Sequence, residues 1–234
     1  MLVHIFICVR ARYRKISPFI ISVTVVLAVT AAIIIGVIAR SSSKIIFQTE
    51  YHFVCFAVRD NSLSADAISD TVVSYGGAGY VLEYKGSYYV TVACYYTKTE
   101  ANRVKQNLLK RGLNCSVLSV KTDNYNIQSL GARGKEKLFT GNLNTLYSLS
   151  QMCYECANGL DTGEYNQSLA KGVLKDVTSG LHGLKLANSE NCFSGEIRRL
   201  LAECESVGDG YIYSKDMRKL QIAIADTIIN IELY

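Results

Sequence analysis

Eight cysteines and three histidines are the side chains of this sequence best suited to nucleophilic, redox or metal chemistry. Cys153 and Cys156 are separated by two residues, a spacing found in redox-active dithiols and in zinc sites. A four-ligand zinc site needs two further ligands, but no second pair of this spacing exists and His182 is the sole histidine of the C-terminal half. We therefore expect buried thiols on a helix face, with no metal and no cofactor.

The remaining reactive residues fall in patterns typical of structure. His4 and His52 belong to no nucleophile or metal motif. The glycine-rich stretch 76–79 follows a helical pattern and precedes a strand pattern, the reverse of the order that cradles phosphate. Three more cysteines stand at strand positions that suit a small apolar side chain: Cys55, Cys94 and Cys115. We predict free thiols and no enzyme activity.

Residues 88–120 contain the clearest structural pattern, a strand followed by a helix and a second strand. Apolar and polar residues alternate from Tyr88 to Tyr95, as in a strand with two distinct faces. Thr97 and Glu100 have capping-box spacing, and Gly112 is suited to the left-handed position that ends a helix. The spacing therefore predicts one βαβ unit.

The same unit occurs about 36 residues upstream, and the two are joined by a tight turn at Lys85-Gly86. Its strand and helix faces are formed by Tyr51, Phe53, Cys55, Ala57, Ala65, Ile68 and Val72. The order βαββαβ predicts an α+β fold, a ferredoxin-like sandwich with one antiparallel sheet and both helices on one face.

Two stretches resemble the halves of a SPOR domain. They are FVCFAVRDNSLSADAISDTVVSYGG and YYVTVACYYTKTEANRVKQNLLKRGLNCSVLSV, and the resemblance covers residues 50–121. SPOR domains are exported modules that bind peptidoglycan glycan strands along the helix-free sheet face. The resemblance implies a non-catalytic protein of bacterial cell division or envelope remodelling, related to sporulation proteins by this domain.

The helix-free face is where we expect a ligand to bind, because sugar rings stack on aromatic side chains and tyrosine hydroxyls bond sugar hydroxyls. If Phe53, Cys55, Val90 and Val92 face the helices, the opposite face carries the candidate site. Its residues are His52, Val54, Phe56, Tyr89, Thr91 and Tyr95, with Val58 beside them.

A second interpretation of this face is equally open. Val54 stands where SPOR domains commonly carry glutamine, and Phe56 where they carry glycine. A broad apolar sheet face is usually covered by protein, and the C-terminal helical bundle is available to cover it. The sequence thus allows either a glycan-binding module or a scaffold that uses the sheet face and the helical bundle for contacts with envelope or division proteins.

Residues 16–39 contain no charged side chain and are long enough to cross a hydrocarbon core of roughly 30 Å. We expect a single-pass transmembrane helix here, with a cleaved signal peptide as the alternative. The basic tail 1–15 carries four positive charges and no acid, which predicts a cytoplasmic N-terminus and a folded part outside the cell membrane. Those four charges leave only +1 of the net +5 for the remainder, which argues against nucleic acid as a partner.

The C-terminal part has a helical texture and resembles no family. The segment 121–134 has a linker composition, and residues 135–234 then show four amphipathic patterns separated by short breaks. This arrangement predicts an antiparallel helical bundle as a second domain.

Overall fold

The computed structural model describes residues 44–126, 136–187, 193–208 and 210–231. The described residues from Ile45 onward form one compact unit. Its strands and helices are β1 (Lys44–Arg59), α3 (Ser62–Ser74), β2 (Tyr80–Tyr84), β3 (Ser87–Tyr95), α4 (Lys98–Lys110), β4 (Ser116–Asn126), α5 (Glu136–Thr162), α6 (Gln167–Ala187), α7 (Phe193–Val207) and α8 (Ser214–Asn230).

The four strands form one antiparallel sheet in the order β2-β3-β1-β4, so the chain is α+β with the predicted βαββαβ order. The hairpin between β2 and β3 turns at Lys85 and Gly86, both with positive φ (52° and 76°), as a two-residue type I′ turn requires. This turn places Tyr84 opposite Ser87. The local signals in the sequence therefore set the hairpin register.

Helix α4 begins and ends where its sequence predicts. The Thr97 hydroxyl accepts a hydrogen bond from the Glu100 amide and donates one to the Glu100 carboxylate. Gly112 follows the helix with a φ of 79°. Asn61 caps α3 in the same way, since its side chain accepts a hydrogen bond from the Ser64 amide. Capping thus fixes both helices of the sheet unit.

Two irregularities interrupt the pairing of β1 with β3. Val54 lies opposite Ala93, but Cys55 lies opposite Thr91 and Ala57 opposite Val90. Each strand therefore carries one extra residue, Val92 in β3 and Phe56 in β1. A bulge leaves two successive residues on one face, and strict alternation cannot predict which way the side chains of the bulged stretches point.

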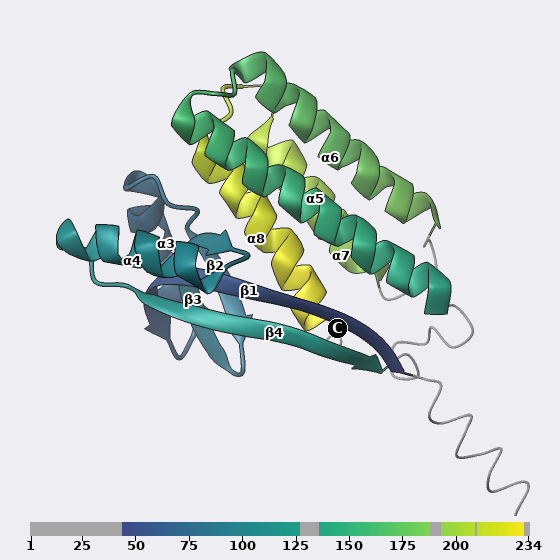
Figure 1. Ribbon diagram of the computed structural model, residues 1–234, viewed down its shortest axis with the longest axis horizontal. Helices are drawn as coiled ribbons and strands as arrows, with labels where there is room; N and C mark the ends of the chain where they lie inside the picture. The colour runs from purple at the N-terminus through teal and green to yellow at the C-terminus, as the bar shows by residue number, and fades with distance from the viewer. Residues whose placement is uncertain (1–43, 127–135, 188–192, 209, 232–234) are drawn as a thin grey trace, which may run out of the picture. The chain divides into compact units, whose positions relative to one another are not determined.

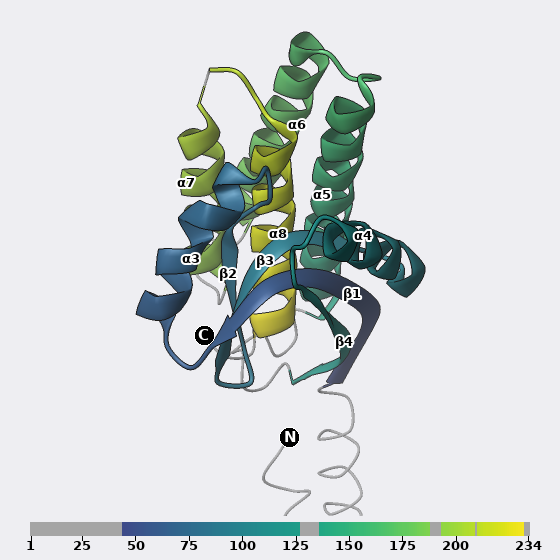
Figure 2. The same ribbon diagram turned by 90° about the vertical axis from the view of Figure 1, so that its left-hand side faces the viewer.

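The C-terminal helices form the predicted four-helix bundle, in which α5 contacts α6 and α8, and α7 contacts α6 and α8. Helix α5 ends at Thr162 before Gly163, which has a φ of 76°. Helix α8 also contacts β2, β3 and β4. Figure 1 shows the sheet between the helix pair α3–α4 and the bundle, and Figure 2 shows α3 and α4 in front of the sheet with α8 behind it.

This architecture corrects or limits what the sequence led us to expect of the sheet face, the domain boundaries and the linker. The sheet face opposite α3 and α4 is not helix-free, because the bundle adds a third layer and joins the predicted domains 50–121 and 135–234 into one unit. The segment predicted as a linker begins as strand. In it, the Thr122 hydroxyl donates to the Phe47 carbonyl and the buried Tyr125 hydroxyl donates to the Ile228 carbonyl.

The described α+β fold also departs from the predicted fold class, which included a transmembrane helix. In the part of the chain that the structure describes, no helix is both long and apolar enough to cross a membrane. The predicted tail 1–15 and span 16–39 lie outside the described residues. The cytoplasmic N-terminus and the exported folded part, which rest on those residues, stay predictions.

Candidate functional site

The interface between the sheet and the bundle is lined by aromatic rings. Tyr96, just after β3, has ring centroids 5.6 Å from Tyr147 and 5.3 Å from Tyr154 of α5, both close to perpendicular. Tyr51 of β1 lies 5.8 Å from Tyr96 and 6.1 Å from Phe53. Edge-to-face aromatic pairs favour these separations. The bundle therefore packs on the sheet as a continuation of its core.

A buried polar network ties β2 to α7 and α8. The Tyr80 hydroxyl donates to Asp226 Oδ2 at 2.5 Å, and Arg199 donates to the Tyr80 hydroxyl at 2.6 Å and to Asp226 Oδ2 at 3.3 Å. Asn230 donates to Asp226 Oδ1 at 2.6 Å and to the Glu83 carbonyl at 3.1 Å. We call Tyr80, Arg199, Asp226 and Asn230 the polar lock.

The lock holds its carboxylate in a dry environment. Burial raises the pKa of Asp226, while the hydrogen bond from Tyr80 and the charge of Arg199 oppose that rise. Burial also raises the pKa of Tyr80, so its hydroxyl remains a donor. Because each polar atom of the lock that loses water gains a partner, the arrangement favours one fixed position of α8 on the sheet.

Further hydrogen bonds join the two layers near the end of β3. The Gln221 side chain of α8 donates to the Cys94 carbonyl at 3.2 Å. The Tyr96 and Ser150 hydroxyls lie 2.8 Å apart and form a hydrogen bond. The sheet and the bundle are thus joined at both ends of their contact.

The predicted site residues do not share one open face. Val54 and Phe56 pack among the residues beneath α4 and α3, respectively, whereas Tyr89 packs with the core beneath the bundle. Thr91 is buried and its hydroxyl donates to the Tyr80 carbonyl at 2.8 Å. The predicted facing of β1 is therefore reversed, because Phe53 and Cys55 lie against the bundle.

His52 and Tyr95 pair across β1 and β3. His52 is buried, with Nδ1 2.8 Å from the Ser119 hydroxyl. Tyr95 contacts the Tyr154 ring at 6.1 Å and lines an open groove. Of the predicted site residues, Tyr95 borders this groove.

The thiols are buried and free, as expected, at six positions: Cys55, Cys94, Cys115, Cys153, Cys156 and Cys204. Burial raises the pKa of Cys156 to about 11 and that of Cys55 to about 12. The thiolate is the reactive form of cysteine, so these groups are poor nucleophiles at neutral pH. The described residues contain no group of three or more side chains placed to hold a metal ion.

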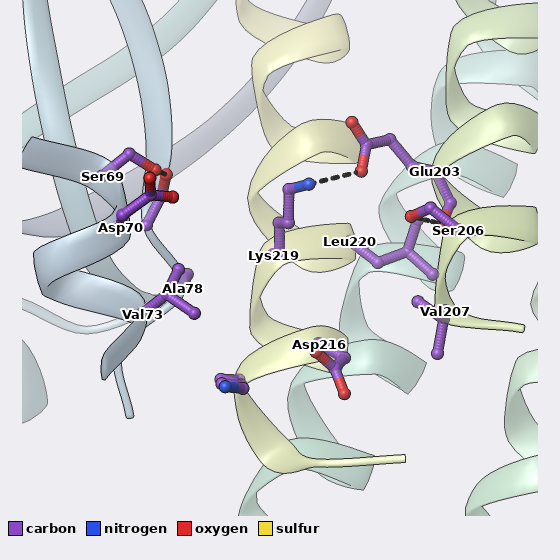
Figure 3. A pocket seen from close by; sticks show the side chains of 12 residues that line it. Ser69, Asp70, Val73, Ala78, Glu203, Ser206, Val207, Asp216, Lys219 and Leu220 are labelled. Carbon is purple, nitrogen blue, oxygen red and sulfur yellow. Dashed lines mark hydrogen bonds and ion pairs between the residues drawn. The ribbon is translucent and has the colours of Figure 1, made fainter. Parts of the chain in front are cut away.

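A small polar cleft of about 290 Å³ lies where α3 and the residues just before β2 approach α7 and α8 (Figure 3). Lys219 of α8 lies across it and forms an ion pair with Glu203 of α7 at 3.0 Å. Asp216 accepts a hydrogen bond from the Tyr213 amide, and Ser69 donates to the Gly79 carbonyl. The contacts of Lys219, Glu203, Asp216 and Ser69 thus support the local structure around the cleft.

The larger groove, about 580 Å³, lies between α4 and the adjoining ends of α5 and α8. We call it the Tyr95 groove. Tyr95 and Tyr154 lie in it, and the Tyr154 hydroxyl donates to Glu100 at 3.1 Å. Arg218 of α8 pairs with Asp161 at the end of α5. The groove is therefore assembled from both halves of the chain.

These contacts and the burial of the side chains shift the pKa values of two groups that line the Tyr95 groove, Asp161 and Tyr154. Burial acts to raise the pKa of Asp161, but the hydrogen bonds from Arg218 and Ser214 and the charge of Arg218 outweigh it and lower that pKa. Burial raises the pKa of Tyr154. The wall of the groove thus carries a fixed ion pair and a neutral phenol that donates a hydrogen bond.

Comparison with known proteins adds no identity. No family model, curated protein or solved structure matches the chain. The SPOR resemblance of residues 50–121 is thus neither supported nor refuted and stays a prediction.

The polar lock was missed from sequence, although α8 contains a signal for it. Asp226 stands in an otherwise apolar run of this helix, and Gln221 and Asn230 occupy further buried positions. A carboxylate on a buried helix face needs a partner. The sequence does not show that this partner is Tyr80, which lies 146 residues away.

Proposed function

We propose that this chain is a non-catalytic protein-interaction scaffold in which the sheet holds the bundle and the outer surfaces of both bind other proteins. The observation that carries the proposal is the burial of the sheet face opposite α3 and α4 beneath α5 and α8. While this contact exists, Phe53 is fully buried and Tyr89 is partly covered by the core beneath the bundle.

Opening the contact would be costly. Phe53 and Tyr51 are fully buried, and burying one large apolar side chain contributes about 1.5–3 kcal/mol. The buried Asp226 carboxylate would also lose the hydrogen bond from Tyr80, and a buried acceptor left without its partner adds to the cost. Because the sheet face is already occupied by the bundle, the geometry favours the scaffold over glycan binding.

The first test is sedimentation of the purified full-length chain with peptidoglycan sacculi, intact or stripped of peptides by an amidase. We expect the chain to stay in the supernatant with both preparations, and the same result for Phe56→Ala and Tyr89→Ala. Enrichment on the stripped sacculi that both substitutions abolish would overturn the proposal in favour of glycan binding.

The second test asks for protein contact directly. A photo-cross-linking residue at exposed Tyr75, and separately at exposed Leu63, should give discrete protein adducts in cells that produce the chain. If exposed positions spread over both layers give no adduct while the chain is folded, the scaffold proposal fails.

A further inference from the structure

The Tyr95 groove has an apolar floor and a basic rim. Val92 of β3 and Val104 and Leu108 of α4 are half-buried and line it together with the two tyrosines. Tyr75, at the end of α3, stands 66% exposed at its edge. An open apolar surface between polar side chains is typical of a binding site.

The rim follows one face of α4. Arg103, Asn107 and Arg111 occur at intervals of four residues and all line the groove. Residues four apart are neighbours on a helix surface. The two arginines are eight residues apart, which places them about 12 Å apart along the helix at 1.5 Å per residue.

The acidic and basic side chains that line the groove differ in the partners they have within the chain. Glu100 accepts hydrogen bonds from Thr97 and Tyr154, and Asp161 is paired with Arg218. Arg103 and Arg111 are exposed, and within the described part of the chain neither forms an ion pair with a carboxylate. Asp161 therefore has a charged partner, whereas Glu100 is held by neutral hydroxyls and keeps its negative charge. Among the described residues, Arg103 and Arg111 are the unpaired positive charges of the rim, and they outnumber that one acid.

We propose that the Tyr95 groove binds an acidic peptide segment of a partner protein, in extended conformation, with an apolar side chain between two carboxylates. In a strand, side chains two apart share a face and the rise is about 3.3 Å per residue, so positions four apart span about 13 Å. Carboxylates at the first and fifth positions therefore match the two arginines. The side chain at the third position faces the floor formed by Val104 and Leu108.

This inference rests on the proposed scaffold function and names the chemistry of one partner. The probe is a fluorescent peptide with two glutamates four residues apart, a leucine midway, and serine or glycine elsewhere. Its anisotropy is followed on titration with the full-length chain in a non-ionic detergent. Two control peptides replace the glutamates by lysine or the leucine by serine.

The decisive variant is Arg103→Glu combined with Arg111→Glu, and the matched control is Lys110→Glu. Lys110 is a basic, exposed residue of the same helix that does not line the groove. We expect the double substitution to weaken binding about tenfold, since two partly exposed ion pairs are reversed. Lys110→Glu should leave the affinity unchanged, and added salt should weaken binding of the wild-type chain.

Circular dichroism melting of each variant separates loss of binding from loss of the fold, and Arg103→Gln with Arg111→Gln provides a milder second variant. The inference is overturned if the acidic peptide does not bind the folded chain, or if Lys110→Glu weakens binding as much as the double substitution. If the peptide does not bind but other surfaces give protein adducts, the scaffold proposal holds and only the groove inference fails. If the chain binds stripped sacculi, the scaffold proposal itself fails.

Discussion

The two faces of the sheet are closed by different means. Beneath α3 and α4 most of the buried side chains are small and apolar, such as Ala65, Val72, Val90 and Ala101, and Tyr95 is the large exception. Beneath the bundle they are large aromatics crossed by hydrogen bonds such as that of Tyr125 to Ile228, 103 residues away. The first face is closed by neighbours in sequence, and the second by specific pairing of distant segments.

This difference indicates how easily each layer of helices could move relative to the sheet. Small apolar contacts tolerate adjustment, whereas a buried hydrogen-bond network fixes one arrangement. The bundle is thus a fixed layer rather than a removable cover, which is why the scaffold is favoured over an openable glycan site. The following four experiments test the contrast, from the largest expected effect to the smallest.

Phe53→Ala and Val54→Ala compare the two faces at adjacent, fully buried positions of β1. The first should lower the free energy of unfolding by about 3–5 kcal/mol, because it leaves a cavity under the bundle. The second removes two methyl groups and should cost about 1–2 kcal/mol. Urea unfolding measures both, and equal losses would remove the proposed asymmetry between the faces.

Tyr80→Phe tests the polar lock without altering shape. Asp226 and Arg199 would each lose a hydrogen-bond partner, so we expect a loss of about 1–3 kcal/mol. Tyr88→Phe is the control, because Tyr88 packs on the α3 side and is only partly buried; it should change the stability by less than about 0.5 kcal/mol. A loss no greater for Tyr80→Phe than for Tyr88→Phe would show that the lock does not hold the layers.

Thr97→Ala tests the local signals that build the other layer. The substitution leaves the first turn of α4 without its cap, which should cost about 0.5–2 kcal/mol. Thr97→Ser keeps the hydroxyl and should restore most of that stability. Thermal unfolding checks both, and a neutral Thr97→Ala would mean that packing alone positions α4.

His52→Gln should change the pH dependence of stability more than its magnitude. Burial lowers the pKa of His52 below 6.5, the charge of Glu50 opposes this in part, and the charge of Lys98 adds a smaller lowering. As the pH falls below 6.5, the unfolded chain takes up this proton first, so the stability contribution is present above 6.5 and is lost toward the folded pKa.

Unfolding midpoints at about pH 7.5 and about pH 5.5 measure this slope. His52→Gln should reduce the difference between them, while the exposed control His182→Gln should not. An unchanged slope in His52→Gln would contradict the assignment to this residue.

The sequence predicted the elements well wherever the signal was local. The capping pair Thr97 and Glu100, the turn at Lys85-Gly86 and the stop at Gly112 each act within a few residues, and all were confirmed. Four amphipathic patterns likewise indicated the bundle. Such signals can be interpreted without the rest of the chain, because the residues that interact are close together in sequence.

The candidate site was predicted less well, because it depends on which face of the sheet each strand side chain points to and on which distant helices pack together. The bulges at Phe56 and Val92 arise from pairing between two strands and have no signature in either strand alone. The Tyr95 groove needs α4 beside α5 and α8, which no spacing in the sequence indicates.

By itself, the sequence determined which segments become strands and helices, because caps, turns and periodicity are local properties of the backbone and its neighbours. Only the tertiary structure decided that the bundle covers the second face of the sheet. The partners of that contact, such as Tyr80 and Asp226, are brought together by packing across the whole length of the folded unit.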